Sequence, residues 1–454
     1  MAIESINPAT GETLATYEEL SQPQIDAALT DVVTSFRTWR ALSFEERAQP
    51  MRRAAGYLRE HRDRFARIIT LEMGKPITQA EAEIEKCAWN CEFYADNATQ
   101  FLADRPTPST ASQSYVAFEP LGVVLAVMPW NFPFWQVFRF AAPALMGGNT
   151  AVLKHASNVP QCALAIEEVF QESGFPEGVF RTLLVGSGAV EGIIADQRVA
   201  AVTLTGSDVA GAKVAEAAGR NLKRTVLELG GSDPFIVLGD ADLEVAAKVG
   251  AWARFQNAGQ SCIASKRFIV EESIADAYEE RFVAEVMQLK VGDPLDHETQ
   301  IGPLARADLM ADLESQVQRS VEQGARVVLG GNRRPGAGAY FQPTVLTNVT
   351  SDMPVMREET FGPVAPVYRV RDADEALAVA NDSQYGLGAS LWTTNLDRGQ
   401  ALARQIETGQ VFINGLVASD PRLPFGGVKR SGYGRELGEF GILEFMNIQT
   451  IWVK

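Results

Sequence analysis

Three side chains of different chemistry lie at the boundaries of predicted strands and turns. Cys262 follows a turn rich in Gly and Gln in the segment FQNAGQSCIASKR. Glu228 ends an apolar strand before two glycines, and Asn131 lies between prolines in PWNFPFW. A thiol can act as a nucleophile, a carboxylate as a general base, and an amide as a donor to an oxyanion. The three residues are therefore candidates for these three roles.

Each of these residues also has an ordinary structural interpretation. A single cysteine is usually a buried structural thiol. Glu228 on its own is typical of a surface or ion-paired carboxylate, and Asn131 is typical of a cap on the helix that follows it. No one of the three decides the function.

Small residues follow a further predicted strand in LTGSDVAG (204–211). Gly206, Ser207 and Gly211 lie between this strand and a helix. The spacing is neither the dinucleotide fingerprint nor a Walker A loop. A turn at a helix N-terminus nevertheless suits a phosphate group, so the segment is a weak indication of a phosphate-binding turn.

The usage of histidine and cysteine limits the chemistry. The only histidines are His61, His155 and His297, which leaves few partners for a Cys–His or Ser–His pair and none for a His-rich metal site. Cys87 and Cys91 are four residues apart in a helical pattern, but no second pair of ligands follows. We interpret them as core thiols and expect no metal centre.

The composition indicates a globular protein of two or three domains with a sizeable core, rather than a nucleic-acid or membrane protein. The 454 residues are 46% apolar, and 41 basic against 57 acidic residues give a net charge of -16, which disfavours nucleic acid and anionic membranes as partners. The longest apolar stretch, 121–128, is far shorter than the roughly 20 residues that span a bilayer. The four scattered cysteines and an N-terminus without targeting features predict a cytoplasmic protein.

Strands and helices alternate through most of the chain, and these elements must position the candidate residues. Short apolar strands are predicted at TAVLK, RTLLV, AVTLTG and RTVLELGG, separated by helices near 159–173, 187–196 and 208–220. The alternation resumes at DPFIVL and continues to about residue 412. Such repeats predict parallel sheets covered on both faces. The fold class is therefore α/β with two domains that join near Gly230.

The two ends of the chain have different patterns. The first hundred residues are mainly helical; Ser43 and Glu46 form a capping box, and Pro50 is expected to break or kink that helix. The last ten residues, FMNIQTIWVK, alternate as a strand does. This strand is predicted to pair with a sheet edge, either on another subunit or in its own domain.

Six segments together resemble the aldehyde dehydrogenase superfamily, over nearly the whole chain. They are MPWNFP (128–133), LTGS with Gly211 (204–211), LELGG (227–231), GQSC (259–262), EETFGPV (358–364) and PFGGVKRSGYGRELG (424–438). The resemblance implies an aldehyde dehydrogenase-like fold of two Rossmann-type α/β domains plus a small β oligomerisation element. The expected ranges are 1–102 and 120–229 for the cofactor-binding domain, 230–430 for the catalytic domain, and 103–119 with 440–454 for the bridging element.

The resemblance implies NAD(P)-dependent oxidation of an aldehyde to a carboxylate through a thioester. Cys262 matches the nucleophile of the family, and Glu228 matches the base that activates the deacylating water. Asn131, with the backbone N–H of Cys262, matches the oxyanion hole. The thiol is expected to have a pKa that is lowered, or lowered when the cofactor is bound.

The resemblance also implies a set of cofactor-binding residues: Trp130, Lys154, Gly206, Ser207, Leu229, Glu359 and Phe361. Many NAD-preferring members carry a Glu three residues after the lysine that matches Lys154. This chain has Ser157 there, so repulsion of a 2′-phosphate is absent and NADP is the expected cofactor, with NAD possible. His155 replaces a usual Pro, and we expect no chemical role for it.

The substrate prediction depends on Arg139, which lies on the helix that follows Asn131 and is expected to face the acyl tunnel. A buried arginine is costly unless it meets an anion. Arg139 and Ser419 resemble carboxylate-binding positions of succinate-semialdehyde dehydrogenases, and Trp135 is a further candidate. The alternative for Arg139 is a structural ion pair.

Two positions depart from the pattern of those enzymes. A second arginine of some members aligns with Gln256, and a vicinal thiol aligns with Ala264, so no active-site disulfide is expected. The predicted reaction is oxidation of succinic semialdehyde to succinate with NADP. The alternatives are glutarate semialdehyde or a neutral aliphatic aldehyde as substrate, a cofactor-free ester hydrolysis as a side activity, and a non-catalytic scaffold. We expect a homodimer or homotetramer.

Overall fold

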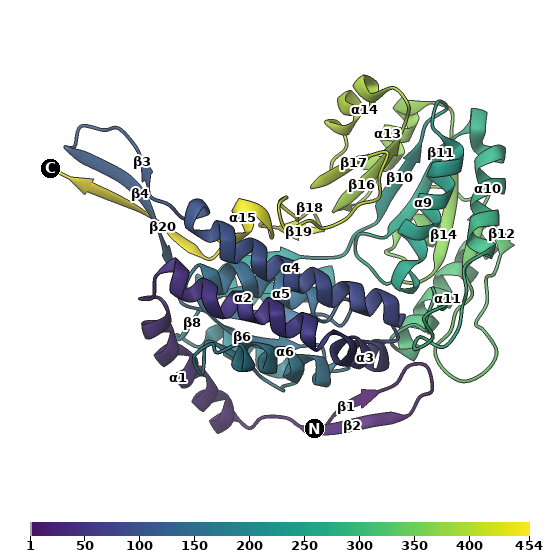
Figure 1. Cartoon of the computed structure of the whole chain (residues 1–454). Coiled ribbons are helices and arrows are strands. Elements are labelled where there is room, and N and C mark those ends of the chain that lie inside the picture. The colour runs from purple at the N-terminus through teal and green to yellow at the C-terminus, as the bar shows by residue number, and fades with distance from the viewer. Residues whose placement is uncertain (1) are drawn as a thin grey trace.

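Two large, mostly parallel sheets organise the protein (Figure 1). The computed structural model describes residues 2–454. The first sheet has the strand order β19-β9-β8-β5-β6-β7. Its strands are β5 (Val123–Met128), β6 (Thr150–His155), β7 (Phe180–Thr182), β8 (Val199–Thr205), β9 (Arg224–Glu228) and β19 (Gly432–Tyr433). All are parallel neighbours except β19, which comes from the C-terminal region and pairs antiparallel with β9.

Helices cover both faces of this first sheet, as the strand–helix alternation predicts. Val123 and Leu125 pack on one face with α1 and α8, whereas Val124 and Ala126 pack on the other with α2 to α6. The helices are α1 (Gln22–Trp39), α2 (Phe44–Glu60), α3 (Arg62–Met73), α4 (Ile77–Phe101), α5 (Trp135–Met146), α6 (Pro160–Glu172), α7 (Val190–Ala195) and α8 (Asp208–Arg220). A sheet buried on both faces explains the nearly continuous apolar strands.

The second sheet has the order β12-β13-β14-β11-β10-β16-β17. Its strands are β10 (Asp233–Val237), β11 (Ser265–Glu271), β12 (Arg326–Leu329), β13 (Thr344–Thr347), β14 (Val364–Val370), β16 (Gly388–Trp392) and β17 (Gln410–Ile413). Its helices are α9 (Leu243–Phe255), α10 (Ala275–Met287), α11 (Ala307–Glu322), α12 (Pro354–Arg357), α13 (Ala373–Asn381) and α14 (Leu396–Ala403). Phe235 and Val237 pack on one face with α9 and α10, and Ile236 packs on the other with α13.

The C-terminal strand pairs within its own chain. Strand β20 (Met446–Val453) runs antiparallel to β4 (Gln113–Pro120), which also pairs with β3 (Arg105–Pro106). This three-stranded sheet projects from the body of the molecule (Figure 1). The strand prediction for the last ten residues is confirmed, and of its two possible edges the structure shows the one in the same chain.

Short elements complete the chain. They are the hairpin β1 (Ala2–Ile6) and β2 (Thr13–Glu18), the pair β15 (Tyr385–Gly386) and β18 (Val428–Lys429), the 3-10 helices η1 (Ser187–Ala189), η2 (Gln256–Gly259) and η3 (Glu272–Ile274), and α15 (Gly438–Leu443). Within residues 2–454, no helix combines the length and apolar character needed to cross a bilayer.

Of the two outcomes expected for Pro50, a break or a kink, the break is wrong. Helix α2 runs through Pro50, and Ser43 and Glu46 form the predicted capping box at its start. Proline removes one backbone hydrogen bond, but Pro50, Met51 and Ala54 are all buried. The packing of this face keeps the helix continuous.

Candidate active site

Cys262 lies on a tightly coiled turn between η2 and β11. Asn257, Ala258 and Gly259 have φ values of 51°, 53° and 73°, in the left-handed region that residues other than glycine rarely adopt. The Gln260 side chain donates back to the Asn257 carbonyl at 3.1 Å and fixes this conformation. Cys262 is a free cysteine of intermediate burial, and it lies just before β11, an inner strand of the second sheet.

Two cavities meet at this thiol. The first, which we name the α4–α5 cavity, has a volume of about 210 Å³ and is lined by Lys86, Trp135, Arg139, Gln256 and Ser419 among others. The second, the strand-end cavity, has a volume of about 360 Å³ and lies where β5, β8 and β9 end. Cys262 and Gln136 line both cavities. The thiol therefore has access to two separate binding spaces.

The structure brings most of the predicted site residues together around these two spaces. The strand-end cavity is lined by Trp130, Asn131, Gly206, Ser207, Glu228, Leu229, Glu359 and Phe361. Trp135, Arg139 and Ser419 line the α4–α5 cavity. Lys154 lines a third cavity of about 440 Å³ beside α8. Ser157 is exposed and lines none of the three.

Burial controls the acidity of the Cys262 thiol. Burial raises its pKa to about 12, and the positive charges of Arg139 and Lys266 oppose this increase. The thiol of the protein alone is therefore protonated near neutral pH. Of the two expectations for this pKa, only a decrease that accompanies cofactor binding agrees with this environment, because a cation near the sulfur favours the thiolate.

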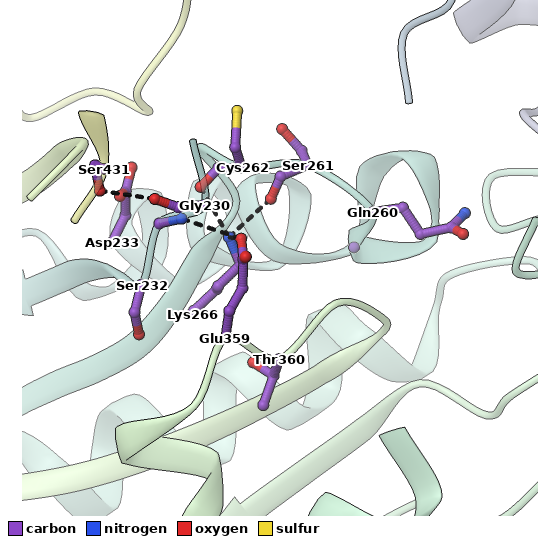
Figure 2. Close-up of polar contacts among 12 residues, drawn as sticks. Gly230, Ser232, Asp233, Gln260, Ser261, Cys262, Lys266, Glu359, Thr360 and Ser431 are labelled. Carbon is purple, nitrogen blue, oxygen red and sulfur yellow. Dashed lines mark hydrogen bonds and ion pairs between the residues drawn. The ribbon is translucent and has the colours of Figure 1, made fainter. Parts of the chain in front are cut away.

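Lys266 connects the backbone of Cys262 to the carboxylate of Glu359, which lines the strand-end cavity. Its ammonium donates to the carbonyl oxygens of Ser261 and Cys262, both at 2.8 Å, and lies 3.0 Å from Oε1 of Glu359. The same Glu359 oxygen accepts from the Gly231 N–H at 3.1 Å. In Figure 2 the Cys262 sulfur points away from Lys266, whereas its carbonyl oxygen faces it. The lysine thus orients the turn and leaves the sulfur free.

The loop that carries Asn131 is fixed from two sides. His155 Nδ1 accepts from the Ala156 N–H, so its Nε2 donates to the Pro133 carbonyl at 2.9 Å, and burial lowers the His155 pKa to about 4. Asn131 Nδ2 donates to the Gln260 carbonyl at 3.3 Å. A neutral His155 therefore has a structural task, and Asn131 is placed beside the Cys262 turn.

Helix α4 fixes the other side of this loop. Glu83 Oε1 accepts from the backbone N–H groups of Phe134 and Trp135 at 2.8 and 2.9 Å, and its second oxygen pairs with the buried Lys75. A carboxylate in this place caps the start of α5. The alternative role for Asn131 as that cap is therefore filled by Glu83.

Glu228 lies at the carboxyl end of β9 and is fully buried. Within residues 2–454 neither of its carboxyl oxygens has a hydrogen-bond partner. Burial, and next the charge of Glu436, raise the pKa of Glu228 well above its usual value, although Arg139 and Arg435 lower it. An unpaired buried carboxyl next to a cavity is not the surface residue of the alternative interpretation. It is a group available to exchange protons with a molecule in the cavity.

Two cations line the α4–α5 cavity, one paired with a carboxylate and one with a hydroxyl group. The Arg139 guanidinium pairs with the buried Glu436 carboxylate and lies 4.3 Å from the centroid of the Phe425 ring. The Lys86 ammonium donates to Ser419 Oγ at 2.7 Å and lies 4.4 Å from the centroid of the Trp135 ring. Arg139 thus has the structural ion pair foreseen as its alternative and also lines the cavity.

The strand-end cavity has a surface that fits a dinucleotide. A β-carbon at Gly230 would lie 2.3 Å from a carboxyl oxygen of Glu359, and one at Gly211 would lie 2.6 Å from the end of the Leu229 side chain, so a larger residue at either position would displace that side chain. Ser207 caps α8 by accepting from the Ala210 N–H at 3.3 Å, and the start of this helix suits a phosphate. The cavity beside α8 adds Lys154, whose burial lowers its pKa. The turn after β8, the start of α8 and Lys154 thus offer donors and a positive charge that suit an anionic ligand.

Sequence reasoning missed Lys86, Lys266, Gln136 and Glu436. A charged pair at the start of an apolar strand, Lys266 with Arg267, was the one local signal. The Lys86 partner Ser419 is 333 residues away, and no pattern within a segment reveals such a contact.

This fold and this arrangement of thiol, amide and carboxyl groups belong to a known class. The aldehyde dehydrogenase family matches residues 1–451, and the chain belongs to this family. Its members oxidise small-molecule aldehydes, so the chain is an oxidoreductase that acts on aldehydes.

Several relatives resemble the chain over its full length. It is 56% identical over 453 residues to a protein from Synechocystis sp. described as a probable succinate-semialdehyde dehydrogenase [NADP(+)], with all of both chains covered. It is 51% identical over 457 residues to succinate-semialdehyde dehydrogenase [NADP(+)] 1 of Mycobacterium ulcerans, with all of both chains covered. The crystal structure of succinic semialdehyde dehydrogenase from Streptococcus pyogenes with NADP+ has a TM-score of 0.97 and 42% identity, and 99% of each chain is covered.

Proposed function

We propose that the protein oxidises succinic semialdehyde to succinate with NADP+. The observation that carries this proposal is the position of Cys262 at the junction of two cavities, one lined by cations and one by glycine turns. A cavity of about 210 Å³ suits a short substrate, and its cations suit a carboxylate at the far end. The relatives named for this reaction support the same substrate and cofactor.

In the proposed reaction the Cys262 thiolate attacks the aldehyde carbon. Asn131 Nδ2 and the backbone N–H of Cys262 donate to the oxygen as it becomes an alkoxide, and one such donor contributes about 3 kcal/mol. A bound oxidised cofactor would supply the acceptor for the hydride that this carbon loses. A thioester then remains on the sulfur of Cys262.

Glu228 completes the proposed cycle as a general base. It takes a proton from water, the oxygen attacks the thioester carbon, and Cys262 departs as thiolate. The raised pKa of the carboxyl makes it a stronger base than an exposed glutamate once it is deprotonated. Arg139 and Arg435 favour the charged form and limit the increase.

We infer which residues hold the cofactor from the strand-end and α8 cavities. Gly206 and Ser207 at the start of α8 are assigned to the pyrophosphate, and Lys154 to the adenosine ribose or its 2′-phosphate. Glu359 and Phe361, with Trp130 and Leu229 nearby, are assigned to the nicotinamide half. Ser157 is uncharged, so it does not repel the 2′-phosphate as a glutamate would.

We propose a separate role for each of the three sheets. The first sheet binds the cofactor, the second carries the nucleophile, and the β3–β4–β20 sheet joins subunits in a dimer or tetramer. Ile448 and Trp452 on β20 are 59% and 52% exposed, which supports an interface there. Four free cysteines, three of them buried, support a reducing compartment such as the cytoplasm.

A kinetic panel tests the proposed function. Succinic semialdehyde, glutarate semialdehyde and butanal are compared with NADP+ and with NAD+ by the absorbance of the reduced cofactor. The proposal expects the highest kcat/KM for succinic semialdehyde with NADP+. Equal values for the semialdehyde and butanal would contradict the substrate assignment.

A trapping experiment tests the thioester. Glu228→Gln keeps the nucleophile and removes the base, so a succinyl adduct should accumulate on the peptide that contains Cys262 during turnover. Mass spectrometry of the intact and digested protein detects it. The absence of any adduct would contradict the covalent mechanism.

A further inference from the structure

The charges that line the α4–α5 cavity do not balance. Arg139 pairs with the Glu436 carboxylate. Among residues 2–454, no carboxylate lies within ion-pair distance of the Lys86 ammonium, whose contacts are the Ser419 hydroxyl and the Trp135 ring. One cation of this cavity is therefore compensated, and the other is not.

The nearby carboxylates have other partners. Glu83 lines the same cavity, but its oxygens are used by Lys75 and by the start of α5. Asp420 follows Ser419 and pairs with Arg422 at 2.6 Å. Lys86 is thus a largely buried cation with neutral contacts only, an arrangement that is costly unless an anion arrives.

We propose that Lys86 is a specificity-determining residue whose ammonium, together with the Ser419 hydroxyl, binds the remote carboxylate of the aldehyde substrate. This inference rests on the proposed function and deepens it, because it assigns the substrate carboxylate to a residue on α4. Gln256 in the same cavity brings no charge, so Lys86 supplies a second cation beside Arg139, whose charge is offset in part by Glu436.

The hydrogen bond between the two residues prepares them for an anion. Ser419 Oγ accepts from Lys86, which leaves the serine O–H free to donate to a carboxylate oxygen. The ammonium has three N–H donors and uses one of them for this bond. The Trp135 ring against the ammonium restricts its position. Two adjacent donors, one from α4 and one from the segment after β17, therefore line the same part of the cavity.

The acidity of Lys86 agrees with this arrangement. Burial, and next the positive charge of Arg139, lower the pKa of Lys86 to about 8. Glu83 and Cys87 on α4 and Asp420 in the following segment act in the opposite direction. A bound carboxylate would favour the charged amine, so substrate and proton support each other's binding.

The main test replaces Lys86 by methionine, which keeps the length of the side chain without the charge. The measured quantity is kcat/KM for succinic semialdehyde divided by kcat/KM for butanal. We expect this ratio to fall by about tenfold or more in Lys86→Met, because a hydrogen bond to a charged group is lost. Lys86→Arg keeps the cation and should keep most of the ratio.

Controls separate the inference from the proposed function. Lys248→Met removes an exposed lysine on α9 and should leave the ratio unchanged. If wild-type protein itself shows no preference for the semialdehyde, the proposed function fails. If wild type prefers the semialdehyde and Lys86→Met keeps the same ratio, the proposed function stands and the role of Lys86 is overturned.

Two further readouts do not depend on the catalytic step. Product inhibition by succinate should weaken by about tenfold in Lys86→Met, and an unchanged inhibition constant would overturn the assignment. In wild type the substrate ratio should decline as pH rises through about 8, whereas in Lys86→Arg it should not. Titration of Cys262 affects both aldehydes and cancels in the ratio, so a decline that persists in Lys86→Arg would also overturn it.

Discussion

The two cavities that meet at Cys262 are built in different ways. The strand-end cavity is formed by turns that directly follow β5, β8 and β9, and its shape depends on small residues such as Gly206 and Gly230. The α4–α5 cavity is formed by helices and by a late loop, and its character depends on buried charges such as Lys86 and Arg139. In the proposed function the strand-end cavity holds the cofactor and the α4–α5 cavity selects the substrate. Substitutions should therefore separate the two sides.

The largest loss of activity is expected at Cys262, where the two cavities meet. Cys262→Ala should lower turnover of every aldehyde by more than about 10⁴-fold, because the nucleophile is lost. Binding of NADP+, measured by calorimetry or fluorescence, should be retained, since the cofactor side does not need the sulfur. Residual dehydrogenase activity near that of wild type would show that another group carries the reaction.

The pH dependence of the same sulfur should report on the cofactor side. A pKa of about 12 means that the thiolate is a minor form that increases as pH rises. Alkylation of Cys262 by iodoacetamide should thus accelerate about tenfold per pH unit, or about 10³-fold between about pH 7 and about pH 10. Peptide mass spectrometry distinguishes Cys262 from the three buried cysteines.

Addition of NADP+ should shift this rise to lower pH, because a positive charge near the sulfur favours the thiolate. A rate that levels off near neutral pH without cofactor would contradict the raised pKa.

On the substrate side, Arg139→Ala should raise KM for succinic semialdehyde by roughly 10- to 100-fold, and far less for butanal. The variant also leaves the buried Glu436 without its partner, so the free energy of unfolding should fall by about 3–5 kcal/mol. Kinetics and urea denaturation measure the two effects. Equal changes of KM for both aldehydes would show that Arg139 has only a structural role, in its ion pair with Glu436.

The smallest effect is expected at the exposed end of the cofactor side. Ser157→Glu should raise KM for NADP+ by about tenfold, because a carboxylate repels the 2′-phosphate, and solvent screens part of this repulsion. KM for NAD+ should change little. Ser157→Ala is the control for loss of the hydroxyl. If both variants raise KM for NADP+ equally, the added charge is not the cause.

The two cavities also differ in how far the sequence could predict them. The fold class could be predicted, because strands and helices alternate in short local segments. The positions of Asn131 and Glu228 at the ends of strands could be predicted for the same reason, since each belongs to a short segment at the end of an apolar strand. The partners of the α4–α5 cavity come from segments far apart: Lys86 meets Ser419, and Arg139 meets Glu436. Long-range packing decides these contacts, and the Pro50 error has the same origin.

The antiparallel pairing of β19 with β9 has a consequence for how the protein is made. Gly432 lies opposite Glu228, and the Leu229 N–H donates to the Ser431 carbonyl at 3.0 Å. The edge of the first sheet at β9 thus stays open on the ribosome until Gly432 and Tyr433 emerge, long after its other strands are synthesised. Until then the unpaired edge of β9 is open to pairing with other chains, and Glu228 acquires its final surroundings only when β19 arrives.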